Sequence, residues 1–133
     1  MLTRAGAIFA SVTLGQYSKL FVDYDKTPVS LSALHTSGRQ VEVSGLSEGT
    51  RDQLNLALRL AALELYLGRA TALPFVADDL FVNFDDDRST AGLHALRDLS
   101  TKTQGLFLSH HDHPLPKIQA VFGSEVNVVR LQR

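Results

Sequence analysis

Two adjacent carboxylates, Asp78 and Asp79, follow an apolar run over residues 73–77. Such a run predicts a strand buried on both faces, with the acids at its carboxyl end, where α/β sheets present their ligand sites. Two acids there are costly unless a cation lies against them, and Mg²⁺ fits because it binds few carboxylates together with phosphate oxygens. We therefore expect Asp78 to face a magnesium ion and Asp79 to orient an attacking water. The alternative is a pair of solvated loop acids that cap the next element.

A second candidate site is the segment Ser47-Glu48-Gly49, which precedes a strongly predicted helix. The start of a helix offers free backbone N–H groups and the positive end of a dipole, and both attract anions. Gly49 lets the backbone come close to a phosphate, and Ser47 adds a hydroxyl donor. Taken alone, this short pattern favours an ordinary helix start, so its meaning depends on its neighbours.

The run His110-His111-Asp112-His113 contains good metal ligands. Adjacent residues of an extended strand point to opposite sides, however, and the spacing matches no known zinc-binding pattern, so we do not expect a structural metal site. A histidine that ends a strand beside Asp78 would donate a hydrogen bond to a phosphate oxygen. For His111 and His113 the alternative is an ordinary loop position.

The elements that must position these residues fall into two parts. The amino-terminal part, residues 1–45, predicts the end of a helix and then an antiparallel meander of three strands. The helix is expected over 5–13, stopped by Gly15, and the strands over 20–24, 29–34 and 40–43.

The carboxyl-terminal part, residues 46–133, alternates helices and strands. A helix is predicted over 50–67 because apolar residues recur at helical spacing, and Thr50 with Gln53 predicts a capping box at its start. The remaining elements are expected as strands over 73–77, 106–109 and 126–131, the second of them also buried, and helices over 86–100 and 115–122. The acidic run that begins at Asp85 suits a helix start. The fold class is therefore α/β: a partial parallel sheet with flanking helices, plus the antiparallel meander.

Composition limits the possible functions. A chain of 133 residues, 44% apolar and 20% charged, is an ordinary globular domain or part of one, and we treat 1–133 as a single partial domain. The net charge of −1 excludes a basic footprint over the whole domain for nucleic acid. The absence of cysteine excludes disulfides. No stretch suits a membrane span and no convincing signal peptide is present, so we expect no membrane contact and a cytoplasmic location.

In this order the pieces resemble the carboxyl half of the ABC-type ATPase head of the SMC, RecF and SbcC group, in particular its YhaN-like bacterial members. Their pattern is LS-x-GT-R-DQ-L-x-LALRLA, then LP-hydrophobic-DD, then N-F-D-x-x-R, then a strand that ends in HH. The matching segments are 46–61, 73–79, 83–88 and 106–111. Order and spacing of four motifs together are more specific than any one of them.

The resemblance implies a role for each acid and histidine. Asp78 would be the Walker B residue that binds Mg²⁺. Asp79 stands where many relatives carry the catalytic glutamate and is one methylene shorter. His110 would be the switch histidine, with His111 as a possible substitute. Asp85, seven residues after Asp78, would be the D-loop residue at a dimer interface.

Ser47 and Gly49 would belong to the signature motif of such a head. By resemblance, the signature motif closes over the γ-phosphate of ATP bound by a partner head, whereas Walker B serves the head's own nucleotide. The chain would thus dimerise around ATP, contribute to two sites and complete neither.

The sequence also departs from the family pattern. It contains no G-x-x-x-x-G-K-[ST] phosphate loop and no Gly-Lys pair, and the amino half and the coiled-coil arms of relatives have no counterpart in it. ATP hydrolysis would therefore require a P-loop-bearing N-terminal half, and any DNA contact would use other regions. Three accounts are open: a fragment of a longer gene product, a split head whose partner chain supplies the P-loop, or a decayed remnant.

Three functions compete at this point. The first is an ATPase half-head in DNA repair or chromosome maintenance, as the resemblance implies. The second is a non-enzymatic interaction domain that uses apolar surface. The third is a small metal-dependent hydrolase that uses Asp78, Asp79, His110 and His111.

Overall fold

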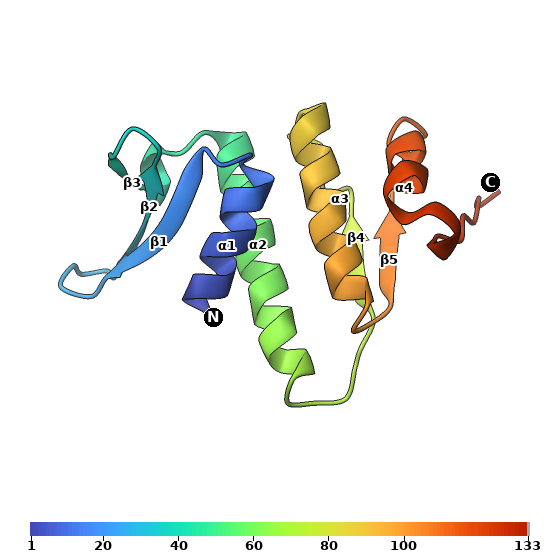
Figure 1. Ribbon diagram of the computed structural model, residues 1–133, viewed down its shortest axis with the longest axis horizontal. Coiled ribbons are helices and arrows are strands. Elements are labelled where there is room, and N and C mark those ends of the chain that lie inside the picture. The colour runs from blue at the N-terminus through green and yellow to red at the C-terminus, as the bar shows by residue number, and fades with distance from the viewer. Residues whose placement is uncertain (133) are drawn as a thin grey trace.

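A computed structural model describes residues 1–132. In Figure 1 the antiparallel strands lie at one end, two parallel strands lie toward the other, and the long helices stand between them. The elements in chain order are α1 (Leu2–Val12), β1 (Tyr17–Asp23), β2 (Ser30–His35), β3 (Gln40–Glu42), η1 (Val43–Gly45), α2 (Glu48–Leu67), β4 (Phe75–Asp78), α3 (Asp86–Ser100), β5 (Gly105–Leu108), α4 (Leu115–Phe122) and η2 (Gly123–Glu125).

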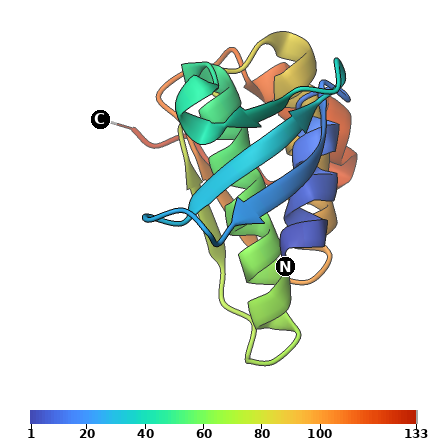
Figure 2. The same cartoon turned by 90° about the vertical axis from the view of Figure 1, so that its left-hand side faces the viewer.

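The antiparallel meander is confirmed, in the order β1-β2-β3. Its inner face is apolar because side chains alternate along each strand. Leu20 of β1 lies opposite Ala33 of β2, and both are buried. Figure 2 shows this sheet lying across α1 and α2. Tyr17 stacks on Phe9 of α1, with ring centroids 5.3 Å apart, so the meander and the helices share one core.

Helices α1 and α2 pack side by side and hold the centre of that core. The buried residues of α1 recur at helical spacing, which gives the helix one apolar stripe. At the edge of the contact, the Arg4 guanidinium donates from Nε and Nη2 to the two carboxylate oxygens of Glu64, at 2.7 and 2.9 Å. This two-point ion pair fixes the relative position of the two helices.

The start of α2 differs from the prediction. The helix begins at Glu48, and Ser47 is its N-cap, since the Ser47 hydroxyl accepts a hydrogen bond from the Thr50 backbone N–H at 3.2 Å. The capping box predicted for Thr50 and Gln53 is therefore wrong: both residues already lie inside the helix and are buried. An earlier serine with extended backbone satisfies the free N–H groups first.

Strands β4 and β5 pair in parallel, as predicted, with Val76 opposite Leu106. The expectation that both strands are buried on both faces is wrong. Phe75, Ala77 and Phe107 are shielded, whereas the side chains that alternate with them, Val76, Leu106 and Leu108, are 53%, 44% and 49% exposed. Within residues 1–132, helices cover one face of this pair, and the other face is open. We call Val76, Leu106 and Leu108 the open face.

Two other predictions concern the carboxyl-terminal part. The helices over 86–100 and 115–122 are confirmed at those bounds. The strand predicted over 126–131 is wrong: residues 126–132 form no regular element, because an alternating pattern becomes a strand only beside a partner strand. Residues 1–132 contain no helix that is both long and apolar enough to cross a membrane.

The Arg4–Glu64 ion pair generates a pH prediction. Its hydrogen bonds hold the pKa of the Glu64 carboxyl below its ordinary value. The pair therefore stabilises the fold above that ordinary pKa, and the contribution is lost as the pH falls through the lowered pKa of the folded state. Glu64→Gln should reduce the free energy of unfolding by about 0.5–1 kcal/mol at neutral pH, because Arg4 is half exposed.

Urea unfolding at neutral pH and well below the carboxyl range would measure this effect, and the deficit should shrink at the lower pH. Glu125→Gln is the control, since Glu125 meets Arg97 at 3.6 Å on an exposed surface. A deficit of the same size at both pH values would mean that the ion pair contributes nothing beyond packing.

Candidate functional site

Asp78 is the last residue of β4, where it pairs with Leu108 of β5. Because side chains alternate along a strand, Asp78 lies on the same side as Val76, the open face. Its side chain is exposed, and no other group of residues 1–132 makes a hydrogen bond or ion pair with it. A free carboxylate at the end of a parallel strand suits Mg²⁺, which prefers hard oxygen ligands and few of them from protein.

Asp79 makes the chain turn immediately after β4. Its φ of 45° lies in the left-handed region, which aspartate tolerates better than most residues, and such backbone often marks a functional site. The Asp79 N–H donates to the Leu108 carbonyl at 2.9 Å, so the turn is tied to β5. The Asp79 carboxylate lies 3.6 Å from Nε2 of His110, with side-chain exposures of 27% and 84%. The structure thus brings Asp79 and His110 together across the ends of two strands.

Two further histidines, His111 and His113, lie near Asp79. The rings of His111 and His113 lie 5.5 Å apart, and both line a small hollow that also contacts Asp79, Ser109 and Lys117. Within residues 1–132, no three histidine or carboxylate side chains are placed to hold one metal ion. The small metal-dependent hydrolase, which requires Asp78, Asp79 and histidines around a single ion, therefore gains no support.

The acidic run after Asp79 starts α3, as predicted. Asp85 is the N-cap: its carboxylate accepts from the Arg88 backbone N–H at 2.8 Å and from the Arg88 guanidinium at 3.0 Å. Arg88 in turn donates to Gln16, so Asp85 is linked to the segment between α1 and β1. Asp86 forms an ion pair with Lys117 of α4, and this contact holds the pKa of the Asp86 carboxyl below its ordinary value.

Ser47 and Gly49 occupy the first turn of α2, where backbone N–H groups lack partners in the helix. The hydroxyls of Ser47 and Thr50 lie 2.8 Å apart. A Cβ added to Gly49 would lie 2.8 Å from the backbone carbonyl oxygen of Asn83, so only glycine fits there. The turn therefore rests on the loop that follows Asp79. Within residues 1–132, no hydrogen bond joins Ser47 to Asp78, Asp79 or His110.

Sequence reasoning missed the contacts that hold this loop, residues 80–84. The Phe81 ring stacks near Phe107, with centroids 5.7 Å apart, and meets Phe84 edge to face at 5.2 Å. A Cβ on Gly92 of α3 would lie 2.5 Å from the Phe81 ring. The only local signal was a glycine inside a predicted helix, which often marks close packing.

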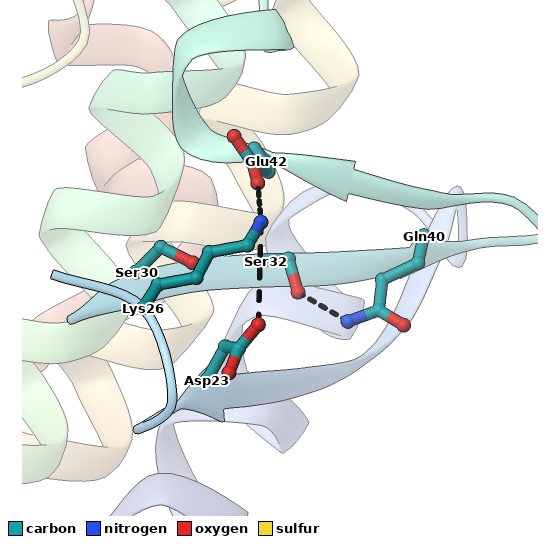
Figure 3. Close-up of a pocket in the computed structure, with 6 residues that line it drawn as sticks. All are labelled: Asp23, Lys26, Ser30, Ser32, Gln40 and Glu42. Carbon is teal, nitrogen blue, oxygen red and sulfur yellow. Dashed lines mark hydrogen bonds and ion pairs between the residues drawn. The ribbon is translucent and has the colours of Figure 1, made fainter.

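A second hollow lies on the outer face of the meander and is lined by Asp23, Lys26, Ser30, Ser32, Gln40 and Glu42 (Figure 3). Its groups satisfy one another. Lys26 forms an ion pair with Glu42 and lies 4.0 Å from Asp23, while Gln40 donates to Ser32 at 2.6 Å. Because its charges are paired and solvated, we assign no ligand to this hollow.

Comparison with known proteins bears on the fold and the family. No protein-family model matches the sequence. The chain is 36% identical over 114 residues to the uncharacterized protein YhaN of Bacillus subtilis (strain 168). That match covers 85% of this chain but 12% of YhaN, so the chain spans about an eighth of the length of its relative.

Three solved structures share the fold. A structure described for ATP-driven dimerization and DNA-stimulated activation of SMC ATPases superposes with a TM-score of 0.70 at 13% identity, over 87% of this chain and 70% of that one. The Smc head of Pyrococcus furiosus, bound to the C-terminal domain of ScpA, gives 0.67 at 16% identity, over 87% and 29%. The SMC head of Thermotoga maritima gives 0.61 at 16% identity, over 90% and 40%.

These matches confirm the family resemblance and the fold class. The chain shares the fold of SMC ATPase heads, and it is similar to YhaN over 85% of its own residues. The roles of the individual site residues stay predictions.

The Phe81–Gly92 contact generates a stability prediction. Gly92→Ala should lower the free energy of unfolding by about 1–3 kcal/mol, because the added methyl group overlaps the Phe81 ring. Phe81→Leu in the same chain should relieve part of that loss. Thermal or urea unfolding of the single and double variants measures both effects.

Gly105→Ala is the matched control, since a Cβ at that position meets nothing within 4 Å. It should change stability by no more than about 0.5 kcal/mol. Equal losses for Gly92→Ala and Gly105→Ala would show that Phe81 does not pack against α3 as described.

Proposed function

We propose that this chain is the C-terminal part of an ATP-binding and ATP-hydrolysing head, inactive until a P-loop-bearing half joins it. The observation that carries the proposal is the approach of Asp79 to His110, 3.6 Å apart at the adjoining ends of β4 and β5. In a chain with the SMC-head fold, this is the edge of the sheet at which a ligand would be bound.

Asp78, Asp79 and His110 would each have a separate role in ATP hydrolysis. Asp78, free and on the open face, would hold Mg²⁺, which when bound supplies positive charge to phosphate oxygens. Asp79 would orient the attacking water and accept its proton at a carboxylate oxygen. His110 would donate a hydrogen bond to a phosphate oxygen. The contact between Asp79 and His110 supports these roles because it places both side chains at the same edge of the sheet.

The first turn of α2 would serve a second nucleotide. Ser47 and the unpaired N–H groups beside Gly49 would bind the γ-phosphate held by a partner head, in a dimer formed around ATP. Asp85 would lie at that interface. The ATP-driven dimerization described for an SMC ATPase of the same fold supports this proposal. A homodimer would thus contain two composite sites.

The P-loop half would cover the open face. Parallel strands are stable when both faces are covered and their edges are paired, and here Val76, Leu106 and Leu108 are exposed. Asp78 lies on the same surface, so it would face the partner that covers these strands. We propose that this partner, in the same gene product or in a separate chain, supplies both the missing phosphate loop and the missing apolar layer.

The cellular role is proposed from the family. SMC-like heads suggest DNA repair or chromosome maintenance, with DNA bound through regions outside residues 1–133, in the cytoplasm. A non-enzymatic interaction domain is the second candidate. It is favoured by the same open face, which would bind a partner even if the acids had no catalytic role.

ATP turnover separates the two candidates. The purified chain with Mg-ATP should be inactive alone and should hydrolyse ATP when mixed with the P-loop-bearing half. In the mixture, Asp79→Asn should still bind ATP but lower kcat by about 10²–10⁴-fold, because the amide cannot accept a proton. Asparagine also tolerates the left-handed backbone at this position.

Asp87→Asn is the matched control, since Asp87 is an exposed acid in the first turn of α3 outside the proposed site. Its turnover should equal that of the unmodified chain. Full activity in Asp79→Asn would overturn the role of Asp79. A stable complex with the P-loop half and no turnover would favour the interaction domain.

A further inference from the structure

We propose that Asn83 is a positioning residue that couples the first turn of α2 to the loop between Asp79 and Asp85. Through Asp52 and Gly49, it would transmit the position of the signature turn to the acid that orients water. The catalytic consequence rests on the proposed function, but the mechanical coupling can be tested without it.

The first contact is a hydrogen bond between distant parts of the chain. Nδ2 of Asn83 donates to Oδ2 of Asp52 at 2.8 Å, across 31 residues of sequence. Asp52 lies on α2, one turn after Gly49, and Asn83 lies in the middle of the loop. The bond is solvent-exposed, which weakens it, and its acceptor is a carboxylate, which strengthens it relative to a neutral acceptor.

The second contact is between backbone atoms. The Asn83 carbonyl oxygen occupies the space that a side chain on residue 49 would fill, at 2.8 Å from its ideal Cβ. Asn83 therefore meets α2 at two points: its side chain donates a hydrogen bond, and its carbonyl group lies close to the backbone of Gly49. Neither the helix turn nor the loop can shift toward the other without a clash, and the hydrogen bond resists their separation.

Further contacts along the loop would transmit a movement of α2 to Asp79. Asp79, which immediately precedes the loop, is tied to β5 because its N–H donates to the Leu108 carbonyl at 2.9 Å. Phe81 and Phe84 pack against each other, and the Phe84 N–H donates to the Phe81 carbonyl at 3.1 Å. Asp85, which immediately follows the loop, is the N-cap of α3. With contacts at its start, middle and end, this segment is expected to pass on a displacement rather than absorb it.

The arrangement has a specific consequence. The signature turn would respond to the nucleotide of a partner head, whereas Asp79 would act on the nucleotide of its own head. Asn83 connects the two, so that closure on one nucleotide places Asp79 for hydrolysis of the other. Asn83 itself would not touch ATP, which means that its loss should affect turnover and leave nucleotide affinity intact.

Hydrogen–deuterium exchange of the 133-residue chain tests the coupling directly. Asn83→Ala should increase amide exchange both in the loop over 80–84 and in the first turn of α2. Asn55→Ala is the matched control: Asn55 is exposed on the same helix, and no hydrogen bond of its side chain occurs within residues 1–132. Faster exchange confined to the immediate neighbours of residue 83 would overturn the proposal.

Turnover in the mixture with the P-loop half tests the catalytic consequence. Asn83→Ala and Asp52→Ala should each lower kcat by about tenfold to a hundredfold, with KM and the ATP affinity unchanged. The double variant should lose no more than either single variant, because both remove the same bond. The exchanged pair Asp52→Asn with Asn83→Asp, which restores an amide–carboxylate hydrogen bond, should recover much of the activity.

The outcomes are distinguishable. If the unmodified mixture does not hydrolyse ATP, the proposed function fails, and the exchange experiment still decides whether the coupling exists. If the unmodified mixture is active and Asn83→Ala retains full kcat, the coupling proposal fails and the proposed function stands. Equal losses in kcat and in ATP affinity would also overturn it, since they would indicate general damage to the fold.

Discussion

The β4–β5 pair is covered by helices on one face only, and this incomplete burial decides where the candidate site lies. The apolar core lies around α1, α2 and α3 and under the meander, and it is nearly continuous. The two parallel strands stand at its margin, shielded on the side of Phe75 and Phe107 and exposed on the side of Leu106. Asp78, Asp79 and His110 lie at the carboxyl ends of these two strands. The candidate site is therefore in the least buried part of the sheet.

A second constraint governs the loop after the acids. Two glycines, Gly49 and Gly92, sit where any side chain would collide with residues of this loop. One touches the backbone of Asn83 and the other the ring of Phe81. Because glycine has no side chain, α2 and α3 can both pack closely against the short segment between Asp79 and Asp85.

Most of the fold was predictable from the sequence because it depends on local patterns. The helices over 86–100 and 115–122 and the order of the meander follow from apolar spacing and turn residues. The cap of α2 was misplaced, since Ser47 and Thr50 both precede the apolar stripe and only the backbone decides between them. Periodicity shows which side chains are apolar but not which ones pack against a neighbour. For this reason β4 and β5 were wrongly predicted to be buried on both faces, and residues 126–131 were wrongly predicted to form a strand.

The candidate site was also predictable only in part. Asp78, Asp79 and His110 were predicted because acids and a histidine at strand ends are visible as short motifs, and Asp79 and His110 do approach each other. The bond from Asn83 to Asp52 was not predicted, because it joins two ordinary polar residues far apart in sequence, and no local pattern marks either one. Contacts of this kind depend on the path of the whole chain.

The central proposal is that a P-loop-bearing half binds to the open face. The most direct test is hydrogen–deuterium exchange of β4 and β5 in the isolated chain and in the mixture with that half and Mg-ATP. We expect strong protection of the amides around Val76 and Leu106 on mixing, with the meander unchanged. Exchange in β4 and β5 that stays the same in the mixture would contradict it.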